Sequence, residues 1–146
     1  MLCMSQSRTK PQAITTDGAV GVAPGLGGGT VPYELAVSAQ VGAAANNQTL
    51  PAVAGRRTYI AGFTVDGLGA TGASIINVTI TGVLGGTITY TLSIPAGVGA
   101  QLAAPLRIEF SRPIPASADG TAIVVNVPSF GAGNTQANAS AHGFQL

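Results

Sequence analysis

From Arg57 to the end of the chain, apolar and polar side chains alternate along a series of short segments. A period of two residues places successive side chains on opposite faces of a β-strand. No window of useful length shows the 3.6-residue period of a helix, so we expect an almost entirely β fold. The apolar rows expected to face the core are Tyr59, Ala61, Phe63 and Val65; Ile76, Val78 and Ile80; Ile88, Tyr90, Leu92 and Ile94; Leu106, Ile108 and Phe110; and Ile123, Val125 and Val127.

Turn-forming residues separate these segments. Gly85-Gly86, Pro95 to Gly97 and Asp119-Gly120 are combinations that favour tight turns. A further, weaker strand is expected between Gln136 and Phe144. Several short strands with this punctuation are typical of a sandwich or barrel. The sequence therefore predicts an all-β fold, with a single antiparallel β-sandwich or jelly-roll domain.

The register of one hairpin can be predicted from the apolar rows on either side of Gly85-Gly86. A two-residue loop would set the two rows on opposite faces of the sheet, because a slip of one residue reverses every side chain. A three-residue loop over residues 84–86 pairs Ile80 with Tyr90 and Val78 with Leu92, which keeps both rows on one face. We therefore expect the three-residue loop, with Gly86 at positive φ.

The N-terminal third of the chain differs from the rest. Residues 17–30 include six glycines and one proline, a composition that does not support regular structure. Between residues 31 and 41 there is one strand-like stretch, with Tyr33, Leu35 and Val37 on a shared face. We expect residues 1–50 to form an extended, Gly-rich N-terminal arm and residues 51–146 to form the β-sandwich body.

The composition is unusual for a protein that works alone in water. Hydrophobic residues make up 46% of the chain and charged residues only 8%, whereas about 25% charged residues is usual. The surface must then consist of Thr, Ser, Asn, Gln and Gly, or be covered by neighbouring molecules. A net charge of +1 offers no basic face for nucleic acid. The sequence has no basic amphipathic segment and no long apolar segment, so we expect no membrane partner.

Residues that could perform chemistry are few. His142 is the one histidine and Cys3 the one cysteine, so no set of metal ligands is apparent. Asp66 and Asp119 each precede glycine, where an aspartate caps its own turn. Residues 67–72 match G-x-G-x-x-G, but a strand-like segment follows where a dinucleotide site needs a helix. We expect no catalytic residue, cofactor, metal or small-molecule substrate, and therefore a protein that is not an enzyme.

Three segments carry a resemblance to a known family: residues 56–65, 88–97 and 122–131. With these segments and the stretch Pro-Ile-Pro-Ala-Ser at 113–117, the chain resembles the capsid decoration (cement) proteins of tailed bacteriophages. The resemblance implies a structural virion protein, made in the host cytoplasm and bound to the outside of the phage head, which stabilises the capsid lattice. It also implies a homotrimer whose partner is a major capsid protein.

A receptor- or glycan-binding head or fibre module is the alternative. Its ligand would be sought at the loops of residues 66–72 and 128–134. Against it, Trp is absent and two of the three tyrosines fall in expected core rows, whereas sugar sites use aromatic faces. For the decoration protein, we expect interface residues among charged and aromatic groups outside the core, because Arg and Tyr often anchor interfaces. These candidates are Arg8, Lys10, Tyr33, Arg56 and Arg57.

Overall fold

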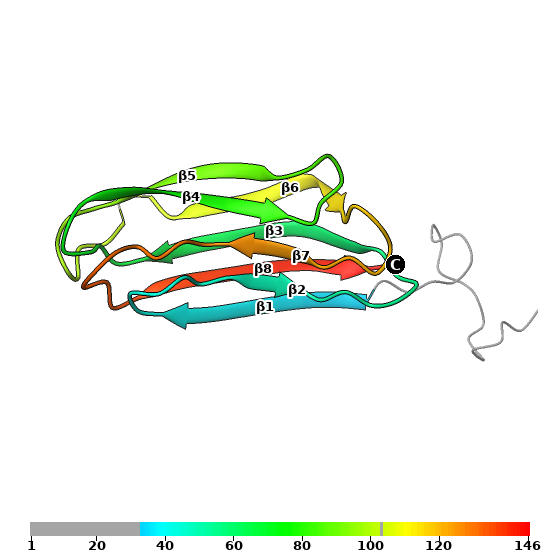
Figure 1. Cartoon of the computed structure of the whole chain (residues 1–146), viewed down its shortest axis with the longest axis horizontal. Helices are drawn as coiled ribbons and strands as arrows, with labels where there is room; N and C mark the ends of the chain where they lie inside the picture. Colours follow the sequence, from blue (N-terminus) through cyan, green and yellow to red (C-terminus); the bar gives the residue numbers. More distant parts are fainter. Residues whose placement is uncertain (1–32, 103) are drawn as a thin grey trace, which may run out of the picture. The chain divides into compact units, whose positions relative to one another are not determined.

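The computed structural model describes residues 33–102 and 104–146, which form two antiparallel sheets of four strands each (Figure 1). The strands are β1 (Tyr33–Val41), β2 (Gln48–Leu50), β3 (Thr58–Gly67), β4 (Ser74–Thr81), β5 (Ile88–Ile94), β6 (Leu106–Pro115), β7 (Ile123–Asn126) and β8 (Ala137–Gln145). Sheet A has the order β1-β8-β3-β6, and sheet B has the order β2-β7-β4-β5. These described residues contain no helix. The predicted antiparallel β-sandwich is confirmed.

The path of the chain identifies the kind of sandwich. Successive strands lie in opposite sheets at every connection except the one between β4 and β5. Two four-stranded sheets in the orders 1-8-3-6 and 2-7-4-5 form a jelly roll, an architecture built from Greek-key connections. Because almost every neighbour in a sheet is distant in sequence, side chains from separate segments are brought to shared faces.

The core lies between the two sheets and is formed by the inward rows that the alternation predicted for β4, β5, β6 and β7. Ile76, Val78 and Ile80 of β4 are buried, as are Ile123 and Val125 of β7. The inward side chains of β6, and those at the start of β5, are only partly buried. β8 contributes a row of alanines at 137, 139 and 141, and it confirms the weak strand expected near the C-terminus.

One predicted row is wrong, because β3 has a bulge. Its register against both neighbouring strands shifts between Ile60 and Gly62. Ile60 is therefore fully buried with Phe63 and Val65, and Tyr59 and Ala61 are not part of that row. Tyr59 instead stacks on Phe144, with ring centroids 5.0 Å apart. An extra residue in one strand reverses the faces of all residues on one side of it.

The β4–β5 hairpin keeps the predicted faces but not the predicted register. Ile80 pairs with Ile88 and Val78 with Tyr90, two residues away from the expected pairing. The connection is longer than three residues because Val83 is buried and pairs with Ala116 of the β6–β7 connection. Gly86 does have positive φ, at 99°.

Residues 33–50, which the sequence analysis placed in the arm, lie in the sandwich. Each residue of β1 pairs with a residue of β8, from Tyr33 opposite Gln145 to Val41 opposite Ala137. Strand β2 pairs with β7. The paired strands thus begin at Tyr33, which is 18 residues before the expected boundary at residue 51. Residues 1–32 lie outside the described residues.

Candidate functional site: a polar cleft at one end of sheet A

The outer face of sheet A carries short polar side chains in rows that cross the strands. Ser38 of β1 is opposite Ser140 of β8, which is opposite Thr64 of β3. One step along the strands, Gln40 is opposite Asn138, which is opposite Asp66. The antiparallel pairing thus places a carboxylate and two amides side by side at one end of the sheet.

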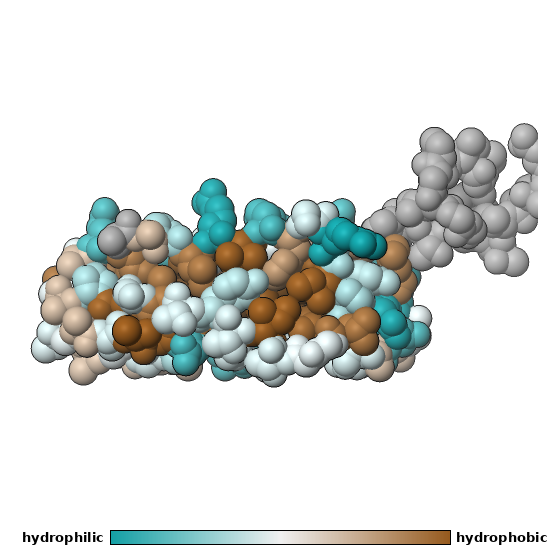
Figure 2. Space-filling view, turned by 90° about the horizontal axis from the view of Figure 1, so that it is seen from above, coloured by the Kyte–Doolittle hydropathy of each residue, from teal (hydrophilic) through white to brown (hydrophobic). Residues whose placement is uncertain are grey.

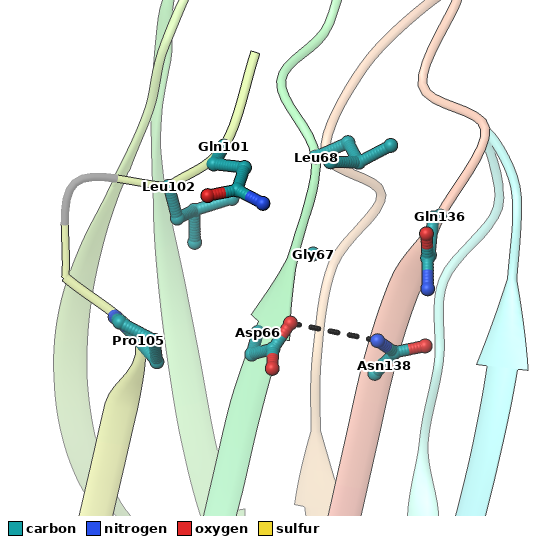
Figure 3. Close-up of a pocket in the computed structure, with 8 residues that line it drawn as sticks. All are labelled: Asp66, Gly67, Leu68, Gln101, Leu102, Pro105, Gln136 and Asn138. Carbon is teal, nitrogen blue, oxygen red and sulfur yellow. Dashed lines mark hydrogen bonds between the residues drawn. The ribbon is translucent and has the colours of Figure 1, made fainter. Parts of the chain in front are cut away.

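Asp66 and Asn138 form the floor of a cleft at this end (Figure 3). The side-chain amide of Asn138 donates a hydrogen bond to Oδ1 of Asp66 at 3.4 Å. Gln101 and Gln136 lie on opposite sides of Gly67, and each carries a further amide to the rim. The cleft has a volume of about 310 Å³, with Leu68, Leu102 and Pro105 as its apolar lining.

A second hollow, of about 380 Å³, continues from the first over the face of sheet A. Both hollows are lined by Asp66 and Asn138. The second adds the hydroxyl groups of Ser38, Thr64 and Ser140. We call the two hollows together the Asp66 cleft. Among the described residues that line it, Asp66 is the only ionisable side chain.

This arrangement suits binding better than acid–base chemistry. Amides and hydroxyls both donate and accept hydrogen bonds, and the carboxylate accepts them. They match the groups of a neutral, polyhydroxylated ligand. Glycoside hydrolysis by the usual mechanism needs a pair of carboxyl groups on either side of the bond to be cleaved. The described lining supplies one carboxylate alone.

A buried amide supports the loops around the cleft. The side-chain nitrogen of Asn134 donates to the carbonyl oxygens of Leu68 at 2.6 Å and Gly69 at 3.3 Å. Asn134 is 4% exposed, and its Oδ1 has no hydrogen-bond partner. The amide ties the segment before β8 to the segment after β3, where the backbone N–H of Leu68 also donates to the carbonyl oxygen of Gln136 at 2.8 Å.

The interface residues predicted from sequence lie elsewhere. Tyr33 and Arg57 are at the opposite end of sheet A, beside the C-terminal residues of β8. Tyr33 is 61% exposed, and Nε of Arg57 lies 2.8 Å from Oδ1 of Asp119. Arg56 is exposed next to this pair. Arg8 and Lys10 lie outside the described residues.

The surroundings of the two aspartates that were expected to cap turns differ from the prediction. Asp66 lies within β3 and accepts from Asn138, so its observed partner is across the sheet and not in a turn. Asp119 is paired with Arg57. The glycine motif at 67–72 is followed by strand β4, as expected. Over residues 33–102 and 104–146, no group of three or more His, Cys, Asp and Glu residues could hold a metal ion.

The sequence analysis missed Gln101, Gln136 and Asn138. Each lies in a different context: Gln101 between β5 and β6, Gln136 before β8, and Asn138 within β8. Only the location of Asp66 at the start of the 66–72 loop pointed to this region. No local pattern links the other three, because the jelly-roll connections bring them together.

The fold and the cleft define a jelly-roll domain with a polar surface groove. No family model matches the chain, and no curated protein matches it. Among solved structures, the chain is similar to one from the structure of the Gt strain of infectious bursal disease virus, with 19% identity and a TM-score of 0.23. That similarity covers 80% of this chain and 30% of the viral chain. In the part of the chain described, no helix has the length and apolarity needed to cross a membrane.

Proposed function

We propose that this protein is a structural virion protein, which binds the outside of a phage head as a capsid decoration protein and is not an enzyme. Its partners in this proposal are copies of itself, in a homotrimer, and a major capsid protein. The observation that carries the proposal is the outer face of sheet B. The jelly-roll order is consistent with it, because viral capsid and lectin domains both use this architecture.

Sheet B contains no charged residue in any of its four strands. Its outer face carries threonine, serine and asparagine, including Asn77, Thr89 and Thr91, all of which are exposed. Asn77 is directly opposite Thr91, and a hydrogen bond of 3.3 Å joins their side chains. Ile75, on the same face, is 71% exposed.

A face of this kind favours contact with another protein. Protein–protein interfaces are depleted of charge at their centres, because buried charges are costly to desolvate. Short side chains such as threonine lose little conformational entropy when a partner covers them. A face on which many copies make the same modest contact would stabilise the lattice by mass action, since it binds the assembled form.

Binding of the purified chain to phage heads tests the proposed decoration role. Purified chain is added to phage heads that lack it, and the heads are sedimented and then heated. The proposal predicts saturable co-sedimentation and a higher temperature of genome release. No binding by the folded chain, or binding that leaves particle stability unchanged, would contradict the decoration role.

The Asp66 cleft favours one alternative, a receptor- or glycan-binding module. Four polar side chains, Asp66, Gln101, Gln136 and Asn138, surround a hollow large enough for one sugar ring. A glycan array probed with the wild-type chain and with Asp66→Ala tests it, and Glu34→Ala provides a control acid on the same sheet. Binding that Asp66→Ala alone abolishes would support the alternative, and no binding by the wild-type chain would contradict it.

A further inference from the structure

The two sheets end on the same side of the sandwich, at β5 and β6 (Figure 1). Within the described residues, β5 pairs only with β4, and β6 pairs only with β3. The inward side chains here are only partly buried: Ile88 and Tyr90 of β5, and Leu106, Ile108 and Phe110 of β6. Figure 2 shows the resulting apolar surface along this side. Among the described residues, strand β6 thus presents an unpaired backbone edge beside partly exposed apolar side chains.

We propose that β6 of one molecule pairs antiparallel with β6 of a second copy, about a two-fold axis that passes beside Ile108. Such a contact is isologous, because each copy offers the same surface. It joins the two copies of sheet A into one continuous sheet. The two-fold contact is distinct from the contacts of the proposed homotrimer, and it stands or falls separately from the proposed virion role.

The charges on β6 favour this register. Arg107 and Glu109 are exposed on the outer face, on either side of Ile108. A two-fold axis at Ile108 sets Arg107 opposite Glu109 of the second copy, and the reverse. Each Glu109 carboxylate, which also lies 3.1 Å from Nε2 of His142, then shares the outer face of the joined sheet with a guanidinium of the other copy. Leu106 then lies opposite Phe110 of the second copy on the apolar side. Both kinds of cross-strand pair stabilise a sheet.

Neighbouring registers bring like charges together. An axis at Glu109 would set that carboxylate against itself, and an axis at Arg107 would do the same for the guanidinium. Like charges directly opposite one another destabilise a sheet. Charged edge strands normally oppose pairing with other chains. Because Arg107 and Glu109 carry opposite charges on either side of Ile108, the register centred on Ile108 is the favourable one.

The contact is limited in length at both ends. Pro105 precedes β6, and Pro113 lacks a backbone N–H to donate to a second strand. The register of β6 against β3 also shifts between Glu109 and Ile114, which ends the regular ladder. The segment left for pairing, residues 106–110, is centred on Ile108. A ladder of this length favours a reversible dimer over extended aggregation.

Charge reversal tests the proposal. Arg107→Glu and Glu109→Arg are made separately, and the fold of each is checked by circular dichroism and thermal unfolding. Each variant alone places like charges opposite one another, so we expect self-association to weaken about tenfold or more. An equimolar mixture restores opposite charges at every position, so we expect a heterodimer by sedimentation velocity. A wild-type chain that stays monomeric at high concentration, or a mixture that stays monomeric, would overturn the proposal.

Cysteine cross-linking tests the register. In a Cys3→Ser background, Ile108→Cys places two thiols directly opposite one another at the axis. Antiparallel partners have Cα atoms about 4.5–5.5 Å apart, within the range of a disulfide. Glu109→Cys is the matched control. With the axis at Ile108, the cysteines at position 109 of the two molecules are not directly opposite, and their Cα atoms lie beyond the limit of about 7 Å for a disulfide. Covalent dimer from Ile108→Cys alone supports the axis, and dimer from Glu109→Cys alone overturns it.

Discussion

Nε2 of His142 lies 3.1 Å from Oε2 of Glu109, and the two side chains meet over the backbone of Gly62. His142 belongs to β8 and Glu109 to β6, on either side of β3. They can reach one another because the residue between them has no side chain. The contact explains the location of the lone histidine, which the sequence analysis did not assign to any site.

Gly62→Ala should destabilise the fold. A Cβ atom there would lie 2.5 Å from Oε2 of Glu109 and 2.7 Å from the backbone oxygen of Ile108. The carboxylate can move aside but the backbone cannot, so we expect a loss of about 1–3 kcal/mol in the free energy of unfolding. Chemical denaturation measures it. Gly72→Ala is the control, since a Cβ there meets nothing within 4 Å; equal losses in both variants would contradict the packing over Gly62.

The register of the β4–β5 hairpin can be tested by a designed disulfide. Asn77 and Thr91 are directly opposite on the outer face of sheet B. In a Cys3→Ser background, cysteines at positions 77 and 91 should form a disulfide, whereas cysteines at 77 and 93 should not, because the second pair is out of register. Free-thiol counting by mass spectrometry decides the matter. Cross-linking of 77 with 93 would restore the register expected from a three-residue loop.

The end of β8 is held by a buried glutamine. Gln145 is 1% exposed, and its amide donates to the carbonyl of Pro51 at 2.7 Å and to Oγ1 of Thr58 at 3.1 Å. Gln145→Met keeps the length of the side chain but removes both hydrogen bonds. We expect a loss of about 1–3 kcal/mol in the free energy of unfolding. Gln101→Met, at an exposed glutamine, should change stability by less than about 0.5 kcal/mol.

The outer face of sheet B can be tested with a single charge. Thr91→Arg places a guanidinium on the exposed outer face of β5, the edge strand of sheet B, without touching the core. If the face contacts the capsid, the variant should fold normally and bind phage heads at least about tenfold more weakly. Ala36→Arg, on the outer face of sheet A and outside the Asp66 cleft, is the control. Equal binding by the two variants would place the contact on another surface.

The faces of most strands could be predicted from sequence because alternation is a local property. The rows of β4, β5 and β7 depend only on which residues are apolar, and they were predicted correctly. The bulge at Ala61 was missed because nothing in the residues around it marks an extra position. The loop was expected to span only residues 84–86, because Ala116, the partner of Val83, lies far away in sequence.

The extent of the sandwich and the cleft depend on long-range pairing. Strand β1 is separated from its partner β8 by almost the whole described chain, so no local signal joined Tyr33–Val41 to the body. The cleft likewise combines Asp66 of β3 with Gln101 and Gln136 from two separate connections. These side chains are distant in sequence and are brought together only by the order of the strands in the sheets. The sequence cannot identify them as one site unless that strand order is known.

Quantitative mass spectrometry of purified particles from the source of this chain tests the structural virion role most directly. The quantity is the molar ratio of this chain to the most abundant shell protein. A decoration protein predicts a ratio near one, or a simple fraction set by the lattice, which Thr91→Arg should reduce. Absence of the chain from purified particles, in cells that express it, would contradict the account.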